Sequence, residues 1–140
     1  MINARLETID EKVSFKKRIK DFRCVAIADG FYEWKREDSK KTPYYFIRKD
    51  KKPIFFAAIF ENDQFCLITE EAKENIKPIH HRQPVILNQT DVNRYLNLQL
   101  LGSGFLKDCK KPDLIFHQVS KEVNIPTNNT VSLIQNVSNN

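Results

Sequence analysis

The sequence contains no long apolar run and few cysteines. No hydrophobic stretch among its 140 residues approaches the roughly 20 that cross a bilayer, and the first residues lack the pattern of a secretory signal peptide. The three cysteines, Cys24, Cys66 and Cys109, are far apart and include no CxxC pair, which indicates neither a disulfide framework nor a zinc site. We therefore expect a cytoplasmic protein with reduced thiols, without a metal, a cofactor or a membrane partner.

No internal repeat or low-complexity linker divides the chain, so a single domain is expected. Hydrophobic residues make up 41% of the sequence and ten are Phe, which is enough for a core. The formal charge is +5, and basic residues cluster at 16–20, 35–41, 48–52 and 107–111. Such clusters suit a phosphate-rich partner, but they are equally typical of a solvated surface, which is favoured for 107–111. Charge alone leaves both readings open.

Hydrophobic periodicity predicts two helices and several short strands. Phe15, Ile19 and Phe22 recur at helical spacing after Ser14, which is expected to cap the first helix. Either Asn88 or Thr90 is expected to cap the second. Strands are expected at residues 24–27, 31–35, 44–48, 54–60, 65–69 and 114–119. The spacing of the runs at 44–48, 54–60 and 65–69 is typical of an antiparallel meander.

One acidic residue, Glu33, lies among three aromatic residues directly after an Asp-Gly turn signal, in the string ADGFYEW. In a strand, Tyr32 and Trp34 would share one face, while Phe31 and Glu33 would take the other. Aromatic neighbours that exclude water would favour the protonated carboxyl group, so Glu33 could exchange a proton near neutral pH. The alternative is a strand residue that faces solvent, and this stretch alone favours that alternative.

Two adjacent histidines, His80 and His81, lie between Pro78 and Pro84 and next to Arg82. A histidine in a loop fixed by prolines and beside a cation can carry a proton or contact a phosphate. The alternative is a surface loop in which neither imidazole has a role, and an isolated pair of histidines favours it. Neighbouring residues on an extended chain point apart and no further ligands stand at zinc spacing, so a metal site is not expected.

Polar side chains near the start of the sequence form the string NARLET. On an extended segment Asn3 and Arg5 would share one face and offer hydrogen-bond donors to a phosphate or a carbonyl oxygen. The alternative is a frayed and inactive end. Cys24 and Cys66 lie within strand patterns, where a buried and inert thiol is favoured over a nucleophile.

These strings occur in the order that is found in one protein family. They are NARxET from Asn3, RC from Arg23, ADGFYEW from Ala28, TPY from Thr42, LIT from Leu67, PIHxRxPVIL from Pro78 and VSxxVN from Val119. The sequence thereby resembles the SRAP family, named for SOS response-associated peptidases, whose members include bacterial proteins and a eukaryotic relative that shield abasic sites in single-stranded DNA. Ordered matches to separate motifs over residues 1 to about 129 make the resemblance far more specific than any single motif.

The resemblance implies a covalent mechanism, in which the amine and the thiol of an N-terminal cysteine trap the open-chain aldehyde of an abasic site as a thiazolidine. It implies three catalytic residues. Asn3 would position the cysteine or the opened sugar, and His80 would promote opening of the deoxyribose ring. Glu33 would shuttle protons and assist removal of the initiator Met.

The resemblance also implies residues that bind DNA. Arg5 and Arg82 would hold the flanking phosphates, while Trp34 and Thr69 would line the path of the strand. Aromatic and basic side chains together suit single strands, whose bases can be splayed and stacked.

The sequence departs from the family pattern in several places. Family members begin with Met-Cys-Gly-Arg and run through a further stretch, which includes a Trp-rich segment, before the NARxET string that starts here at Asn3. Cys24 cannot replace the catalytic cysteine, because its nitrogen belongs to a peptide bond. Ile27 stands where a proline is usual, His81 where an acid is usual and Gln83 where a methionine is usual. Loss of an acid beside His80 removes a group that would favour its protonated form.

Two accounts of this difference are open. In the favoured one, the chain is part of a longer SRAP protein, so an upstream segment or a separate chain supplies the N-terminal strands. In the other, it is a short protein that binds single-stranded DNA without covalent chemistry, as a relic. A peptidase that acts on proteins through Glu33 and His80 is a third, weaker option, so whether the chain is itself an enzyme, peptidase or lyase-like, stays open.

The expected fold is α+β, with an antiparallel β-barrel-like sheet, peripheral helices and the N-terminal portion missing. A partial SRAP domain is expected at residues 1–129, followed by a polar C-terminal tail at 130–140. The expected function is abasic-site processing in the DNA damage (SOS) response, with single-stranded DNA as the partner and a location at the bacterial nucleoid.

Overall fold

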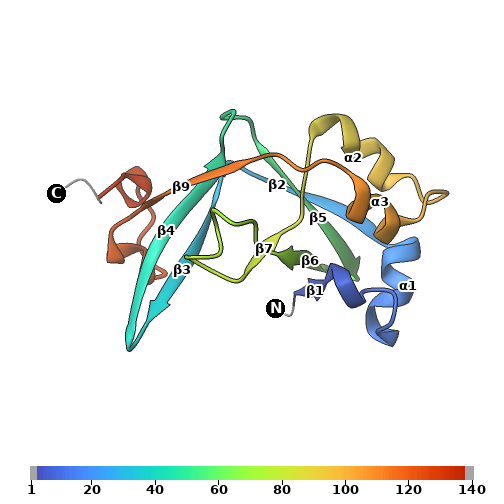
Figure 1. Cartoon of the computed structure of the whole chain (residues 1–140), viewed down its shortest axis with the longest axis horizontal. Coiled ribbons are helices and arrows are strands. Elements are labelled where there is room, and N and C mark those ends of the chain that lie inside the picture. The colour runs from blue at the N-terminus through green and yellow to red at the C-terminus, as the bar shows by residue number, and fades with distance from the viewer. Residues whose placement is uncertain (1–2, 138–140) are drawn as a thin grey trace.

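The computed structural model of the chain describes residues 3–137. Its elements in chain order are β1 (Ala4–Arg5), the 3₁₀ helix η1 (Leu6–Thr8), α1 (Val13–Asp21), β2 (Arg23–Ala28), β3 (Phe31–Glu37), β4 (Lys40–Arg48), β5 (Ile54–Glu61), β6 (Gln64–Glu71), β7 (Arg82–Pro84), β8 (Ile86–Leu87), α2 (Gln89–Leu96), α3 (Gly102–Asp108), β9 (Leu114–Gln118), η2 (Lys121–Asn124) and η3 (Val131–Ile134). Figure 1 shows helices α1, α2 and α3 gathered at one end of the molecule and strands β3, β4 and β9 at the other. The predicted α+β class is confirmed.

The described strands form two sheets. The larger has the order β1-β6-β5-β2, with β7 beside β6 and β8 beside β5, and the smaller has the order β3-β4-β9. The pairs are antiparallel except β1 with β6, which run parallel. Within residues 3–137 the sheets do not close into a barrel, so the predicted barrel-like sheet is instead two open sheets.

The chain changes sheets around Gly30. β2 pairs with β5 up to Ala28, whereas β3 pairs with β4 from Phe31 onward. A Cβ atom at Gly30 would lie 2.4 Å from the ring of Tyr45 and 2.6 Å from the carbonyl oxygen of Phe46, so the close approach at this bend requires glycine. β3 is therefore a continuation of β2 into the second sheet and does not return along it.

The predicted meander of three consecutive strands is only partly correct. β5 and β6 form a hairpin, in which Asn62 takes a positive φ of 54° at the turn. β4 does not pair with β5, because it lies in the smaller sheet between β3 and β9. Hydrophobic runs of suitable length predict strands, but the partner of each strand depends on contacts distant in the sequence.

Neither predicted side-chain cap forms. α1 begins after Lys12, so Ser14 is the second helical residue, and its carbonyl accepts a hydrogen bond from the guanidinium of Arg18. Asn88 directly precedes α2, but its side chain does not bond to the helix amides, and Thr90 lies inside the helix. The C-terminal ends of these helices are stabilised by contacts with another part of the chain.

Arg23 makes the most extensive of these contacts. Its buried guanidinium donates to the carbonyls of Ile19 at 2.6 Å, Tyr95 at 2.9 Å and Leu100 at 2.6 Å. It therefore joins the end of α1 to the end of α2 and to the turn that follows. The backbone of α3 approaches it at Gly102, where a Cβ atom would lie 2.7 Å from Nε of Arg23.

Two hydrophobic cores follow from this arrangement. The first lies between the larger sheet and the helices, and it contains Ala4, Leu6, Ile9, Ile19, Ala57, Ile59, Ile68, Val85, Leu87, Tyr95 and Leu106. The second draws on both sheets and the segment after β6, and it contains Phe46, Ile54, Phe56, Ala72, Ile76, Ile79, Ile86 and Leu114. The second core fixes the relative position of the two sheets, and the candidate site lies at its edge.

The segment after β9 packs back onto the smaller sheet. Leu133 of η3 is buried, and the amide of Val137 donates to the carbonyl of Gln118. The boundary at 129 between a domain and a polar tail stays a prediction. Residues 1–2, which include Met1, and residues 138–140 lie outside the described residues.

Among residues 3–137, no helix has both the length and the apolar character that a membrane span requires.

Candidate functional site

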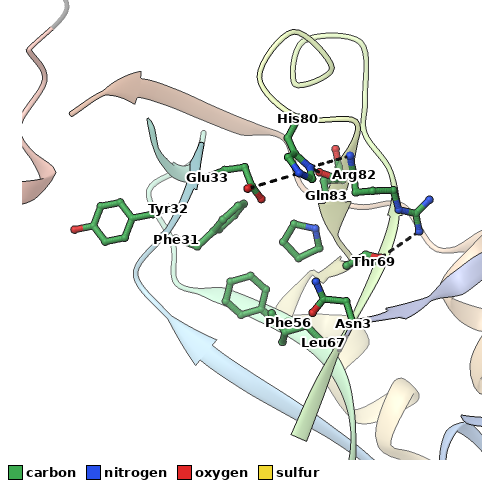
Figure 2. Close-up of a pocket in the computed structure, with 11 residues that line it drawn as sticks. Asn3, Phe31, Tyr32, Glu33, Phe56, Leu67, Thr69, His80, Arg82 and Gln83 are labelled. Atoms are coloured by element: carbon green, nitrogen blue, oxygen red, sulfur yellow. Dashed lines mark hydrogen bonds and ion pairs between the residues drawn. The ribbon is translucent and has the colours of Figure 1, made fainter. Parts of the chain in front are cut away.

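The side chains of Glu33 and His80 point toward one another across a pocket (Figure 2). Oε1 of Glu33 lies 3.9 Å from Nε2 of His80, and the two side chains are 28% and 32% exposed. The alternation of β3 places Glu33 there: Phe31, on the same face, stacks on Phe46 with ring centroids 5.0 Å apart. The sequence-based assignment of Phe31 and Glu33 to one face is thus confirmed. Glu33 does not face open solvent, because it borders the second core.

His80 is oriented by the backbone of Arg82. The amide of Arg82 lies 3.1 Å from Nδ1 of His80, and the carbonyl of Arg82 lies 3.0 Å from the same atom. In the neutral ring, Nδ1 accepts from the amide and the proton on Nε2 faces Glu33. In the imidazolium, Nδ1 donates to the carbonyl instead. The loop therefore holds the ring in one orientation in both protonation states, as a proton carrier requires.

The pocket between these residues has a volume of about 180 Å³. Its floor is apolar and its rim carries one acid, one histidine, one arginine and two amides. The lining residues are Asn3, Phe31, Tyr32, Glu33, Phe56, Leu67, Thr69, His80, Arg82, Gln83 and Pro84. Figure 2 shows Asn3 opposite Glu33 and His80, with Phe56 and Leu67 on the same side of the pocket as Asn3. A small polar molecule can bind here with its apolar side on the floor and its oxygens at the rim.

Arg82 is held in place by two side chains. One terminal nitrogen donates to the carboxylate of Glu7 at 2.8 Å, and the other donates to the hydroxyl of Thr69 at 3.1 Å. The side chain of Arg82 is only 14% exposed, and its Nε is buried without a hydrogen-bond partner in the described part of the chain. Glu7 therefore neutralises part of the charge that Arg82 offers to a ligand, and Thr69 acts through Arg82.

Asn3 and Arg5 reach the site through the parallel pairing of β1 with β6. Arg5 lies opposite Thr69 in that pairing. Asn3 lines the pocket, whereas Arg5 lines an adjoining hollow of about 510 Å³, which we call the second hollow. Both side chains are exposed. The second hollow shares Arg82 with the pocket and is lined by Arg5, Glu7, Glu71, Lys77, His81 and Arg82.

Trp34 is not brought to the pocket. It lies on the opposite face of β3, where its ring centroid is 6.3 Å from that of Tyr32. Its indole nitrogen donates to the side-chain oxygen of Asn124 at 2.6 Å, so it is linked to η2. The structure therefore gathers five of the seven predicted site residues in one pocket, with Arg5 beside it and Trp34 on another surface.

Sequence reasoning did not find the apolar floor or the role of Glu7. Phe56 and Leu67 come from two strands whose hydrophobic runs gave no sign of which residues would face a pocket. Gln83 is nearly buried, and its side-chain oxygen accepts from the amide of Lys73 at 2.9 Å, so it fixes the loop after β6. Glu7 stands in the NARLET string, but only the folded chain places it beside Arg82.

The three thiols are poor candidates for a nucleophile. Cys24, Cys66 and Cys109 are half-buried and form no disulfide among the described residues. Burial raises the pKa of each of the three thiols. A raised pKa lowers the fraction of reactive thiolate at neutral pH. In residues 3–137 no three His, Cys, Asp or Glu side chains are grouped so that they could bind a metal ion.

Comparison of the sequence with known proteins finds relatives in different bacteria that have the same descriptive name. The chain is 38% identical over 149 residues to the abasic site processing protein YoqW of Bacillus subtilis, and the match covers 96% of this chain and 66% of that protein. It is 32% identical to the abasic site processing protein YedK of Escherichia coli, with 98% of this chain and 68% of that protein covered. The chain thus spans about two thirds of the length of these relatives.

Comparison of structures agrees with this result. A crystal structure of a protein from Bacteroides thetaiotaomicron superimposes with a TM-score of 0.83 at 28% identity, over 96% of this chain and 65% of that one. The family model described as SOS response associated peptidase (SRAP) matches residues 1–126, which include every residue of the pocket. This chain therefore belongs to the SRAP family.

Proposed function

We propose that this chain recognises abasic sites in single-stranded DNA and that its pocket receives the sugar of the abasic nucleotide. The relatives at 38% and 32% identity are named abasic site processing proteins, which supports the proposal. The observation that carries it is the approach of Glu33 to His80 in a pocket that also contains Asn3. An abasic sugar has no base, so it is small enough for the pocket and offers oxygens to this rim.

The geometry suits opening of the deoxyribose ring. Ring opening removes a proton from the anomeric hydroxyl and delivers one to the ring oxygen, which leaves an aldehyde. His80 would move these protons, and Glu33 would accept or return a proton at Nε2 of His80. The amide of Asn3, on the opposite side of the pocket, would hydrogen-bond to the opened sugar and position it. Glu33 would also serve the removal of an initiator Met in a longer chain.

Cationic side chains would bind the DNA backbone on both sides of the sugar. Arg5 is exposed and has no ion pair among the described residues, so its charge is available to a phosphate. Arg82 is paired with Glu7, and a phosphate would compete with that carboxylate. Trp34, on the other face of β3, would contact a more distant part of the strand.

The covalent step needs a group that these 140 residues do not offer. A thiazolidine forms when an amine condenses with the aldehyde and releases water, and a thiol on the neighbouring carbon then adds to the resulting imine. Cys24, Cys66 and Cys109 are internal residues, so their nitrogens are peptide amides. We therefore propose that this chain binds abasic DNA noncovalently, and that crosslinking in the SOS response requires a cysteine with a free amine from elsewhere.

An abasic oligonucleotide with added free cysteine tests both parts of the proposal. The purified chain is expected to bind the abasic strand more tightly than the intact strand and to form no denaturant-resistant adduct. It is also expected to accelerate thiazolidine formation between cysteine and the abasic aldehyde, and Glu33→Gln is expected to lose that acceleration. Equal affinity for the two strands would contradict abasic-site recognition. A denaturant-resistant adduct with the chain itself would contradict the noncovalent assignment.

A further inference from the structure

The ring of His81 is a flat surface at the border of the site. His81 is exposed, and its ring lies against that of His80, with centroids 4.7 Å apart and planes inclined by 27°. Its carbonyl accepts from the amide of Ala72 at 3.0 Å, which fixes the loop to the end of β6. One face of the His81 ring is thus covered by His80, and no other aromatic ring of residues 3–137 packs against it. Because His80 faces the pocket, His81 lies one ring outside it.

The second hollow brings this ring together with an available cation. Lys77 is paired with Glu71 at 3.2 Å and with Glu74 at 3.1 Å, and Arg82 is paired with Glu7. Arg5 has no such partner in the described part of the chain. The hollow, at about 510 Å³, is in the size range of pockets that hold molecules as large as a nucleotide. It therefore offers one charge for a phosphate and one ring for a base.

We propose that the second hollow holds the nucleotide next to the abasic site, with its base stacked on His81 and its phosphate on Arg5. This inference rests on the proposed function, because it needs an abasic sugar in the adjoining pocket. The two cavities share Arg82, so a strand whose sugar enters the pocket brings its next nucleotide to the hollow.

The lesion itself provides the reason for stacking on His81. In an intact single strand, each internal base has a neighbour on which either of its faces can stack. A base next to an abasic site has lost one neighbour, so one of its faces is exposed to water. A protein ring that covers this face restores the lost stacking only at the lesion. His81 would therefore contribute to discrimination between abasic and intact strands and not only to affinity.

Binding to strands that lack the flanking base measures this contribution. The full chain is titrated, by fluorescence anisotropy, against a strand with a tetrahydrofuran abasic analogue between two adenines, and against strands in which a second analogue replaces the adenine on one side. The wild type is expected to bind about fivefold more weakly when the stacked adenine is removed, at the low end of base-aromatic stacking. His81→Ala is expected to lose about the same factor on the first strand and to be insensitive to removal of the adenine. His81→Phe is expected to behave like the wild type, because it keeps a ring.

Three other outcomes would contradict either the stacking proposal or the function on which it rests. If His81→Ala weakens binding to all abasic strands equally, the ring acts on a phosphate or on His80, and the stacking proposal is wrong. If His81→Phe behaves like His81→Ala, a flat ring is not the property that matters, and the proposal is again wrong. If the wild type does not distinguish abasic from intact strands, the proposed function fails first.

Discussion

Glu33 and His80 face each other with 3.9 Å between Oε1 and Nε2. This separation allows electrostatic attraction but is longer than a direct N–H···O hydrogen bond of about 2.7–3.2 Å. A small shift of either side chain, or a hydroxyl placed between them, completes a path for a proton. The backbone of Arg82 fixes Nδ1 of His80, so the side chain of Glu33 must shift or the ligand must supply the bridging hydroxyl.

The first prediction is that Glu33 and His80 act as one unit. Glu33→Gln and His80→Ala are each expected to slow cysteine-dependent thiazolidine formation on the chain by about 100-fold, a typical value for loss of a general acid or base. The double variant is expected to be no slower than the slower single variant, because either change breaks the same proton path. Single-turnover rates of the wild type, the two single variants and the double variant together form a double-mutant cycle. Multiplicative losses would show that the two residues act separately.

The second prediction concerns the pair between Arg82 and Glu7. Glu7→Gln removes a carboxylate that competes with DNA phosphate for the Arg82 guanidinium. Affinity for an abasic single strand is expected to rise about threefold, and the slope of log K against log salt to become more negative by about 0.7, the value for one additional phosphate contact. Anisotropy titrations at several salt concentrations measure both quantities.

A matched control separates competition from net charge. Glu122→Gln in η2 makes the same change in charge, and the carboxylate of Glu122 has no ion pair within the described residues. It is expected to change affinity by less than a factor of about two and to leave the salt slope unaltered, because Glu122 does not compete with phosphate for a paired cation and exposed charges are screened. Equal effects of the two substitutions would contradict a specific role for Glu7.

Local patterns were sufficient to predict much of the secondary structure and which residue of β3 shares a face with Glu33, although the stretch alone favoured a Glu33 that faces solvent. The alternation in FYEW correctly separates Phe31 and Glu33 from Tyr32 and Trp34, because a strand has a strict period of two. The prediction of which residues form the site does not rest on local periodicity. It came from the order of the motifs, and five of the residues so chosen do line one pocket. Their individual roles stay predictions.

The parts that could not be predicted depend on contacts between distant segments. The bend at Gly30 moves β3 into the second sheet, and the need for glycine there arises from Tyr45 and Phe46. No sequence pattern reveals that contact before the strands are paired. The same holds for Glu7, which meets Arg82 only because β1 runs parallel to β6. The two predicted N-terminal helix caps are also absent. The contacts of Arg23 are made with carbonyls at the C-terminal ends of α1 and α2, so they do not replace these caps.

The third prediction compares alanine substitutions at two glycines of α3, Gly102 and Gly104. A Cβ at Gly102 would lie 2.7 Å from Nε and 2.8 Å from Cζ of Arg23, whose guanidinium is held by four backbone carbonyls. Gly102→Ala is therefore expected to lower the free energy of unfolding by about 1–3 kcal/mol through overpacking. A Cβ at Gly104 would meet its nearest neighbour, Leu101, at an ordinary 3.8 Å.

The matched substitution Gly104→Ala is expected to raise the free energy of unfolding by up to about 1 kcal/mol, because alanine favours the helix over glycine. Urea unfolding followed by circular dichroism compares the two variants with the wild type. Destabilisation of similar size at both positions would indicate that α3 does not tolerate alanine for a reason unrelated to Arg23.

The fourth prediction concerns the buried hydroxyl of Tyr95. It donates to the carbonyl of Ala58 at 2.7 Å, and burial raises the pKa of Tyr95 well above its ordinary value. Tyr95→Phe removes this hydrogen bond and is expected to lower the free energy of unfolding at pH 7 by about 1 kcal/mol.

The difference between wild type and Tyr95→Phe is expected to depend on alkaline pH. An unfolded tyrosine ionises near pH 10, whereas the folded Tyr95 keeps its proton, so the wild type loses stability as pH rises above about 10. The variant has no such group at this position, although both proteins share the three cysteines with raised pKa. Each pH unit above 10 costs the wild type up to about 1.4 kcal/mol, so in urea titrations the two stabilities are expected to become equal near about pH 11, and the variant is expected to be the more stable protein above that pH. Tyr44→Phe is the control at pH 7, since its hydroxyl has no hydrogen bond in the part of the chain described, and it is expected to change the free energy of unfolding there by less than Tyr95→Phe does. A wild-type advantage that stays constant or grows with pH would show that Tyr95 ionises at least as easily in the folded state as in the unfolded one.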